Sequence, residues 1–337
     1  MKYIVCEKPH EFLLKEKEMP VRKEGEVLLK IRKIGVCGTD IHAYGGTQPY
    51  FEYPRVLGHE LAAEYIEGDV EGFKKGDKVT FIPYFHCGKC IACTNGLTNC
   101  CANIKVFGVH IDGGMAEYIT IPQQYLLDGQ GLDYDQLALV EPLAIAAHGV
   151  RRADVKAKDT VLVMGVGPIG IGLINFAKIA GAKVIAMDIN AYRLNFCKEE
   201  LGADEIINPI TEDVVERLKE ITNGNMPTVV IDATGNRNVM NSAFNYISHG
   251  GRFVLVGLQK GELAFSHPEF HKRESTLMSS RNATTEDFNY VIECLKSGKI
   301  DPSKYITHRA SFDSMIGEFD KWIDPKNNVI KAIIELD

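Results

Sequence analysis

Five cysteines gather within a short stretch of this 337-residue chain, with the spacing Cys87-x2-Cys90-x2-Cys93 followed by Cys100 and Cys101. Four thiolates at such spacing are the donor set of a closed, tetrahedral, structural zinc site. Three ligands are plain from the spacing, while the fourth is either Cys100 or Cys101. The alternative is a set of buried free cysteines. Because the intervening IACTNGLTN lacks the positive charge that nucleic-acid binding requires, we expect the cluster to staple a loop.

A glycine-rich turn could hold a dinucleotide. The segment Gly165-Val166-Gly167-Pro168-Ile169-Gly170 follows the apolar run VLVM and precedes a helical pattern, so backbone N–H groups and a helix N-terminus can meet a pyrophosphate. Asp188 stands 18 residues beyond Gly170, where a carboxylate would accept the adenosine ribose hydroxyls. The alternative is an ordinary strand-helix turn with glycines for close packing.

Asp188 also bears on the choice of nicotinamide cofactor. Two like charges 4 Å apart repel by about 4 kcal/mol near a protein surface, so a phosphate on that ribose would be disfavoured. The sequence therefore favours NAD over NADP. Arg193 lies five residues further on and could relieve the repulsion, which keeps NADP open. A helical position there more often makes a surface or helix-end contact.

A second metal site is indicated nearer the N-terminus. Cys37-Gly38-Thr39-Asp40-Ile41-His42 and Gly58-His59-Glu60 place a thiol, imidazoles and carboxylates in a β-rich region. This mixture suits a zinc ion that keeps an open coordination position for chemistry.

Two kinds of element must position these residues. The first 140 or so residues read as an all-β pattern, with short strands expected at 27–32, 61–66, 78–82 and 118–121. From about residue 158 the pattern alternates strand, glycine turn and helix, and six strands ending near residue 280 predict an α/β, doubly wound parallel sheet. Helices at 286–296 and 312–323 and the strand VIKAIIEL are expected to return to the β-rich domain.

The motifs GVCGTDIH, LGHE, CGKCIACTNGLTNCC, VEPLAIAAHG and VMGVGPIG occur together and in order. In this the chain resembles the zinc-dependent medium-chain dehydrogenases, the family of alcohol, sorbitol and threonine dehydrogenases, over essentially its whole length. The resemblance implies a GroES-like catalytic domain at 1–147, a Rossmann NAD-binding domain at 148–283 and a return to the catalytic domain at 284–337. It also implies a homodimer or homotetramer.

The resemblance further implies a ligand set. Cys37 and His59 would bind the catalytic zinc, with Glu60 and Glu141 as the acidic residues that join or exchange at the metal. Which of the two glutamates binds directly in the resting state stays open. The same resemblance makes Cys101, rather than Cys100, the fourth ligand of the structural zinc.

A proton relay follows from the same resemblance. Thr39 would take the proton of a substrate hydroxyl held at the zinc and pass it through the cofactor ribose to His42. Asp40 would orient His59 from behind. For Thr39 the alternative is a capping hydroxyl, and for His42 it is a strand-end histidine bonded to the backbone.

The segment Glu141-Pro142 matches the sorbitol-dehydrogenase-like branch of the family. Three sequence segments resemble those of bacterial dehydrogenases that act on sugar acids such as galactonate or gulonate. They are TDIHAYGGTQPYFEYPRVLGHE, FGVHIDGGMAEY and SSRNA. We therefore expect hydride transfer from a secondary alcohol of a polyol or sugar acid to NAD. His110 and Arg281 are candidates for binding a substrate carboxylate, with a surface-loop role as the alternative.

Composition excludes other classes. Hydrophobic residues make up 45% and charged residues 25%, as in ordinary globular proteins, and the net charge of −7 with no basic run argues against nucleic acid. We expect no membrane helix, and the acidic residues soon after the start argue against a secretory signal and for the cytoplasm. The rival functions are a zinc-free reductase, an L-threonine 3-dehydrogenase-like enzyme, and a non-catalytic nucleotide- and zinc-binding sensor.

Overall fold

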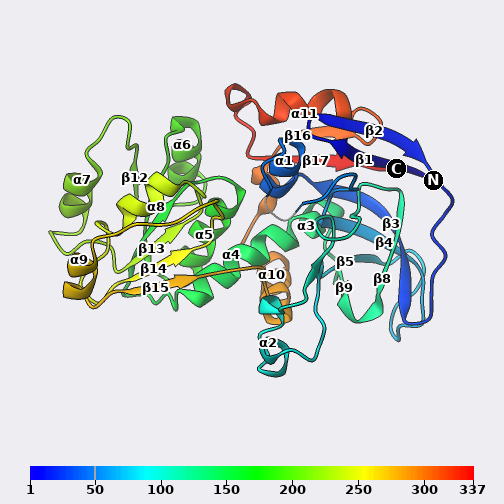
Figure 1. The fold of residues 1–337 in the computed structure, drawn as a ribbon, viewed down its shortest axis with the longest axis horizontal. Helices are drawn as coiled ribbons and strands as arrows, with labels where there is room; N and C mark the ends of the chain where they lie inside the picture. Colours follow the sequence, from blue (N-terminus) through cyan, green and yellow to red (C-terminus); the bar gives the residue numbers. More distant parts are fainter. Residues whose placement is uncertain (49–50) are drawn as a thin grey trace. The chain divides into compact units, whose positions relative to one another are not determined.

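This computed structural model describes residues 1–48 and 51–337. Residues 49 and 50, which fall in the TDIH to LGHE segment quoted above, lie outside the described residues. The chain forms two compact units, one of Met1–Pro142 with Thr284–Asp337 and one of Leu143–Ala283 (Figure 1). We call them unit 1 and unit 2. The first boundary falls within the helix α4 (Val140–Arg152), where the predicted boundary at 147/148 also falls.

Unit 1 is built on a seven-stranded sheet in the order β16-β17-β3-β4-β5-β9, with β8 also paired to β3. Two smaller sheets, β1-β2 and β6-β7, complete it. Its strands are β1 (Lys2–Lys8), β2 (Glu11–Glu16), β3 (Glu26–Gly35), β4 (Glu60–Glu67), β5 (Lys78–Phe81), β6 (Tyr84–Phe85), β7 (Lys105–Val106), β8 (Tyr118–Pro122), β9 (Leu126–Asp128), β16 (Ile306–Ser311) and β17 (Lys331–Glu335). Both chain termini lie on this unit (Figure 1).

The C-terminal segment completes the main sheet of unit 1. Strand β17 runs antiparallel to β3, with Ile333 opposite Gly35, and β16 lies parallel to β17. Apolar side chains from both ends of the chain share one core, among them Ile31, Ile34 and Ile334, which are fully buried. The predicted helices near 286–296 and 312–323 are α10 (Thr285–Lys296) and α11 (Met315–Ile323).

The all-β expectation for the first 140 residues is wrong in its detail. Unit 1 also contains α1 (Gly38–Tyr44), α2 (Ile91–Thr94) and α3 (Tyr134–Ala138). Helix α1 begins because Cys37 and Asp40 form a capping box, in which the Asp40 carboxylate accepts the Cys37 N–H at 2.9 Å. A seven-residue helix shows too little apolar periodicity to be recognised from the pattern alone.

Unit 2 is a six-stranded parallel sheet in the order β12-β11-β10-β13-β14-β15, which confirms the predicted doubly wound sheet. Its strands are β10 (Thr160–Met164), β11 (Lys183–Met187), β12 (Glu205–Ile207), β13 (Val229–Asp232), β14 (Arg252–Leu255) and β15 (Thr276–Ser279). Its remaining helices are α5 (Pro168–Ile179), α6 (Ala191–Glu199), α7 (Val214–Ile221), α8 (Arg237–Ala243) and α9 (His267–Lys272).

The strand order of unit 2 reverses direction at β10, between β11 on one side and β13 on the other. Such a switch point opens a crevice at the carboxyl ends of the strands, and the glycine turn follows β10 directly. The core beneath it consists of fully buried strand residues, including Leu162, Ile185 and Val230.

No helix within residues 1–48 and 51–337 combines the length and the apolar character that crossing a bilayer requires.

Candidate active site and cofactor turn

The candidate zinc ligands Cys37, His59, Glu60 and Glu141 all lie in unit 1. Cys37 stands between β3 and α1, and Glu60 begins β4 directly after His59. Glu141 lies in the first turn of α4. Cys37 and His59 interact electrostatically, and the charges of Glu60 and Glu141 act on the pKa of Cys37 and of His59 respectively. The four predicted ligands therefore interact electrostatically, but within residues 1–48 and 51–337 the one group of three or more such ligand atoms within 4.8 Å of one another is Cys87, Cys90, Cys93 and Cys101.

Asp40 ties together the two segments that carry the thiol and the imidazole. Its fully buried carboxylate accepts the N–H of Cys37 at 2.9 Å and the N–H of Gly58 at 3.3 Å. The Nδ1 atom of His59 lies 3.9 Å from Asp40 Oδ1, beyond hydrogen-bond distance. Among the described residues this buried nitrogen has no hydrogen-bond partner. Asp40 thus binds the backbone next to both residues and lies near the His59 ring without a hydrogen bond to it.

Burial and charge act in opposite directions on these groups. Burial and the Glu60 charge raise the pKa of Cys37, and burial raises the pKa of Asp40. Burial by itself lowers the pKa of His59, but the negative charges of Cys37, Asp40 and Glu141 raise it well above its usual value. Burial raises the pKa of Glu141 to about 7. Such an excess of buried negative charge is what a divalent cation stabilises.

The two glutamates have different partners. Lys331 Nζ on β17 lies 2.8 Å from Glu60 Oε1 and 2.6 Å from Oε2, and both side chains are almost fully buried. Glu141 Oε1 instead accepts a hydrogen bond from the phenol of Tyr84 on β6. The ring of Tyr84 packs edge-on against Phe288 of α10, with centroids 6.1 Å apart. Burial and the Glu141 charge raise the pKa of Tyr84 well above its usual value.

A thiol, an imidazole and carboxylates converging from separate elements form a donor set that zinc uses. The unpartnered Nδ1 of His59 and the crowded negative charge fit such an ion. Sequence reasoning missed Lys331 and Tyr84. A single lysine inside the apolar run VIKAIIEL was the available signal for Lys331, because a charged residue in a buried strand needs a partner. Nothing in the sequence singled out Tyr84.

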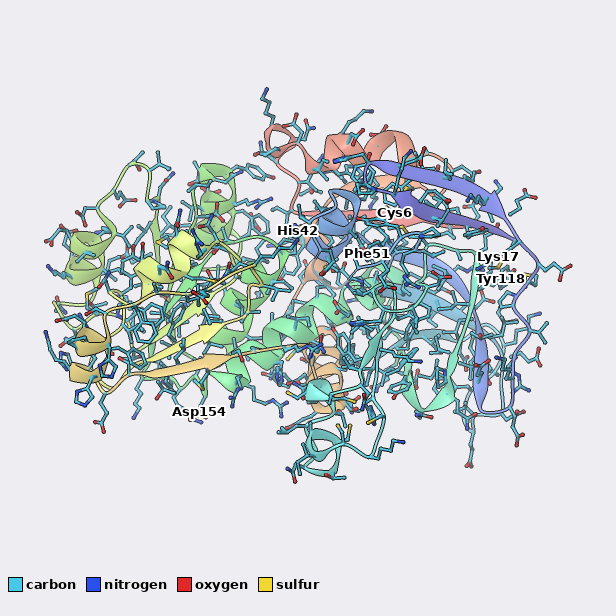
Figure 2. All side chains as sticks on the ribbon, viewed as in Figure 1. Cys6, Lys17, His42, Phe51, Tyr118 and Asp154 are labelled. Atoms are coloured by element: carbon cyan, nitrogen blue, oxygen red, sulfur yellow. The ribbon has the colours of Figure 1, made fainter. Side chains whose placement is uncertain are left out.

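The two relay candidates lie on α1, which begins at the cap formed by Cys37. Thr39 is half-buried and His42 is exposed. Figure 2 labels His42. His42 Nδ1 lies 2.9 Å from Thr47 Oγ1. His42 therefore lies on a helix rather than at a strand end, and a side-chain hydroxyl is its partner.

The cysteine cluster forms a separate lobe around α2. Ligand atoms of Cys87, Cys90, Cys93 and Cys101 all lie within 4.8 Å of one another. Backbone N–H groups of Lys89 and Cys90 lower the pKa of Cys87 to about 6, which favours its thiolate. Cys101 is buried, whereas Cys100 is exposed. Of the two possibilities that spacing left open, Cys101 joins the group.

The glycine turn of unit 2 connects β10 to α5. Gly165 has φ +83° and Gly167 caps α5, with Pro168 in the first helical turn. A Cβ on Gly170 would collide with the Gly165 carbonyl oxygen. Ile169 follows within the same turn of helix. The backbone is therefore bare at the N-terminus of a 12-residue helix, as a pyrophosphate site requires.

Asp188 follows β11 and points its carboxylate at that turn. Its Oδ2 accepts the N–H of Val166 and its Oδ1 accepts the N–H of Asn190, both at 2.8 Å. Arg193 on α6 places Nη1 3.9 Å from the position of a Cβ on Gly167. Both residues predicted for the cofactor thus lie at the glycine turn, and Arg193 faces the turn.

The two substrate candidates lie in different units. His110 belongs to unit 1, where its Nδ1 accepts the N–H of Val106 at 3.0 Å. Arg281 belongs to unit 2, two residues after the end of β15.

A zinc donor set in a β-rich unit, joined to a doubly wound sheet with a dinucleotide turn, defines a zinc-type, nicotinamide-linked dehydrogenase. Comparison with known families agrees. Residues 23–130 match the model described as alcohol dehydrogenase GroES-like domain, and residues 168–297 match the one described as zinc-binding dehydrogenase. The chain belongs to the zinc-type medium-chain alcohol dehydrogenase family, and it is an oxidoreductase of CH–OH groups.

Individual relatives cover the whole chain. It is 44% identical over 336 residues to L-galactonate-5-dehydrogenase of Escherichia coli (strain K12), which covers 99% of this chain and 98% of that protein. It is 31% identical over 344 residues to sorbitol dehydrogenase of Bacillus subtilis (strain 168), covering 99% and 97%. The crystal structure of the alcohol dehydrogenase rspB from E. coli CFT073, complexed with NADH, matches with TM-score 0.92 and 32% identity, covering 100% and 99%.

Proposed function

We propose that this protein oxidises a secondary alcohol of a sugar acid of the galactonate or gulonate type, with NAD as hydride acceptor and zinc at the Cys37 site. The buried side chains of Cys37, His59, Glu60 and Glu141 in unit 1, whose charges act on one another, carry the proposal. The sugar-acid substrate is supported by the 44% identity to L-galactonate-5-dehydrogenase over 99% of the chain. A polyol substrate is the broader form of the same proposal.

Zinc held by Cys37, His59 and a glutamate would act as a Lewis acid that lowers the pKa of a substrate hydroxyl towards neutrality. Asp40 would keep His59 in place through the backbone, since its carboxylate accepts the N–H of Cys37 and the N–H of Gly58, the residue before His59. Thr39, in the first turn of α1, would accept the hydroxyl proton, and His42 one turn further on would pass it to solvent. The exposure of His42 suits that last step.

For the cofactor, the bare glycine turn and the N-terminus of α5 would hold the pyrophosphate, and Asp188 would accept the ribose hydroxyls. Arg193 lies over the turn, where it can contact the same ribose or the phosphates. Because the backbone holds the Asp188 carboxylate fixed beside the turn, we infer NAD rather than NADP. The four-cysteine lobe would hold a second, structural zinc. His110 and Arg281 remain candidates for gripping the substrate carboxylate.

The test is NADH formation at 340 nm by zinc-loaded protein, with L-galactonate, L-gulonate and their epimers, sorbitol, xylitol and L-threonine supplied separately with NAD or NADP. We expect the highest kcat/KM for an aldonate with NAD. Cys37→Ser serves as the inactive control, and Cys100→Ser, which alters an exposed cysteine outside the four-thiol group, controls for cysteine replacement.

A preference for L-threonine would replace the sugar-acid proposal with an L-threonine 3-dehydrogenase-like one. Failure to oxidise any of these compounds, in protein that binds NAD and two zinc ions, would favour the non-catalytic sensor. Light scattering in the same buffer tests the expected homodimer or homotetramer.

A further inference from the structure

The His42 ring has a polar partner that the proposed reaction does not yet use. Its Nδ1 atom lies 2.9 Å from the hydroxyl oxygen of Thr47, which follows α1 in the chain. Both side chains are exposed. The contact bears on which ring nitrogen takes up a proton, because one nitrogen of a neutral imidazole donates a hydrogen bond and the other accepts one.

The turn after α1 brings Thr47 back to His42. The helix ends at Tyr44, and Gly46 has φ +72°, a left-handed conformation that glycine adopts without steric cost. The N–H of Thr47 then donates to the carbonyl oxygen of His42 at 2.8 Å, and the Thr47 hydroxyl lies 3.3 Å from the same oxygen. The backbone therefore fixes the position of the hydroxyl beside the ring.

The hydrogens of this contact can be assigned from the acceptors that surround it. A threonine hydroxyl has one hydrogen to donate and lone pairs with which to accept. Its hydrogen has an acceptor in the His42 carbonyl, which belongs to the last turn of α1, where carbonyl oxygens carry the negative end of the helix dipole. The hydroxyl oxygen is then left to accept from Nδ1. In that arrangement Nδ1 carries the hydrogen, and Nε2 keeps the lone pair of the neutral ring.

The opposite arrangement would stop a proton relay. If the Thr47 hydroxyl donated to Nδ1, the hydrogen of the neutral ring would lie on Nε2, and neither nitrogen would have a lone pair free for a proton. With Nδ1–H donating to Thr47, the ring can gain a proton at Nε2 and lose it again. The Nδ1 hydrogen bond is the same in both states, so the ring does not have to turn or change tautomer.

We propose that Thr47 is a positioning residue for the proton relay, because it holds the hydrogen of the neutral His42 ring on Nδ1 and leaves Nε2 to take up the proton. The N–H bond at Nε2 forms as the O–H bond of the group that delivers the proton breaks, and the same proton then leaves to water. The inference rests on the proposed function and adds to it the nitrogen that acts and the residue that selects this nitrogen.

The tautomer can be measured without turnover, by ¹⁵N NMR of protein labelled only at its histidine nitrogens. A ring nitrogen that carries a hydrogen and one that has a lone pair resonate in separate regions, and couplings to the ring protons tell Nδ1 from Nε2. The His42→Gln variant identifies the His42 signals among those of the 10 histidines. In alkaline buffer we expect hydrogen on Nδ1 in the wild type and in Thr47→Ser. Thr47→Val, which lacks the hydroxyl, should give a mixture of both tautomers.

Kinetics test the relay, with the best substrate of the panel and the burst rate of NADH formation, which precedes product release. Thr47→Val should lower this rate by about 10-fold, a part of the 10²- to 10⁴-fold that a positioned proton acceptor contributes. The dissociation constant of NAD should stay at the wild-type value. The solvent deuterium isotope effect on the burst should rise, because the proton step becomes slower, and Thr47→Ser should restore the wild-type behaviour.

Ser297→Ala is the control for loss of an exposed hydroxyl beside a helix end. Ser297 follows α10 directly, and its hydroxyl donates to the carbonyl oxygen of Glu293 at 2.7 Å. This variant should change neither the His42 signals nor the burst rate.

A double-mutant cycle tests whether Thr47 acts through His42. Once His42→Gln has removed the relay nitrogen, the addition of Thr47→Val should cost no further activity. A merely structural threonine would lower the rate by the same factor in both backgrounds.

The inference is overturned if wild-type His42 carries its hydrogen on Nε2, or if Thr47→Val leaves either the tautomer or the burst rate at the wild-type value. It is also overturned if the losses from Thr47→Val and His42→Gln multiply. If Thr47→Val fails to fold, the wild-type tautomer decides alone. Failure of the proposed function is separate, because protein that oxidises no compound of the panel still gives the His42 spectrum.

Discussion

Replacing Asp188 with asparagine tests whether one carboxylate sets the choice between NAD and NADP. Val166 N–H and Asn190 N–H, both 2.8 Å away, hold this carboxylate beside the glycine turn. A ribose phosphate about 4 Å from it would be repelled by ~4 kcal/mol before screening. At physiological salt the Debye length is about 8 Å, so screening by salt removes only part of this repulsion energy. Because each 1.4 kcal/mol changes an affinity tenfold, the Asp188 carboxylate should account for about 100- to 1000-fold discrimination against NADP.

Asparagine keeps the size of the side chain and one oxygen for a backbone N–H, but removes the charge. The ratio of kcat/KM for NAD to that for NADP should fall by about 100-fold or more, mainly through a lower KM for NADP. Initial rates at 340 nm with the best substrate of the panel, at low and high salt, measure it. Higher salt should narrow the difference between wild type and variant.

Asp204→Asn is the matched control in the same unit. Asp204 also accepts a backbone N–H, from Val184 at 2.7 Å, and pairs with Lys178 at 2.9 Å, but it adjoins the first residues of β11 rather than the glycine turn. Its cofactor ratio should stay at the wild-type value. An unchanged ratio in Asp188→Asn, or an equal change in both variants, would refute the electrostatic argument.

Three further outcomes are expected. Cys37→Ala should abolish turnover while leaving NAD binding largely intact, as measured by quenching of protein fluorescence on NADH addition; full activity would rule out the Cys37 metal site. Cys101→Ser should lose one equivalent of zinc and lower the thermal midpoint, whereas Cys100→Ser should change neither, as metal analysis and calorimetry would show. Asp159→Asn should destabilise unit 2 by about 2 kcal/mol at pH 7, because Asp159 is buried and paired with Arg252 at 2.8 Å. Burial raises the pKa of Asp159, but hydrogen bonds from Lys156, Thr228 and Arg252 outweigh burial, so that the pKa is lowered in the folded state. The stabilisation that the Asp159 carboxylate contributes is therefore present above about pH 4, and it is lost as the pH falls through the folded-state pKa. The difference between the urea midpoints of the two proteins should therefore shrink progressively as the pH falls below about 4, and a constant difference would contradict the assignment.

The doubly wound sheet was predictable because each of its strands is a short apolar run bounded by turn residues. All six runs, from VLVM to STLMSS, form strands in the structure. The spacing of the cysteines likewise predicted the four-thiol group, since a knuckle fixes its ligands through the local backbone. Local patterns carry this kind of information well.

Helix α1 was not predicted, although it carries Thr39 and His42. Seven residues hold two turns, too few for an apolar stripe to show, and the cap that begins the helix uses a cysteine rather than the usual serine, threonine or asparagine. The sequence pointed to Thr39 and His42 as reactive groups, but the helix that carries them could be seen only in the three-dimensional structure.

The partners of Glu60 and Glu141 likewise could not be predicted from the sequence. Lys331 is 271 residues from Glu60 in the chain, and only the order β17-β3-β4 and the bare Cα of Gly35 bring their charges together. A motif names the atoms that can bind a metal, but the free energy of binding depends on what else holds those atoms. A carboxylate already neutralised by a buried ammonium must give up that pairing to gain a metal, whereas one held by a phenol gives up only a single neutral hydrogen bond. Two glutamates that look equivalent in the sequence therefore have different electrostatic surroundings in the structure, and the chain's last strand supplies the cation that distinguishes them.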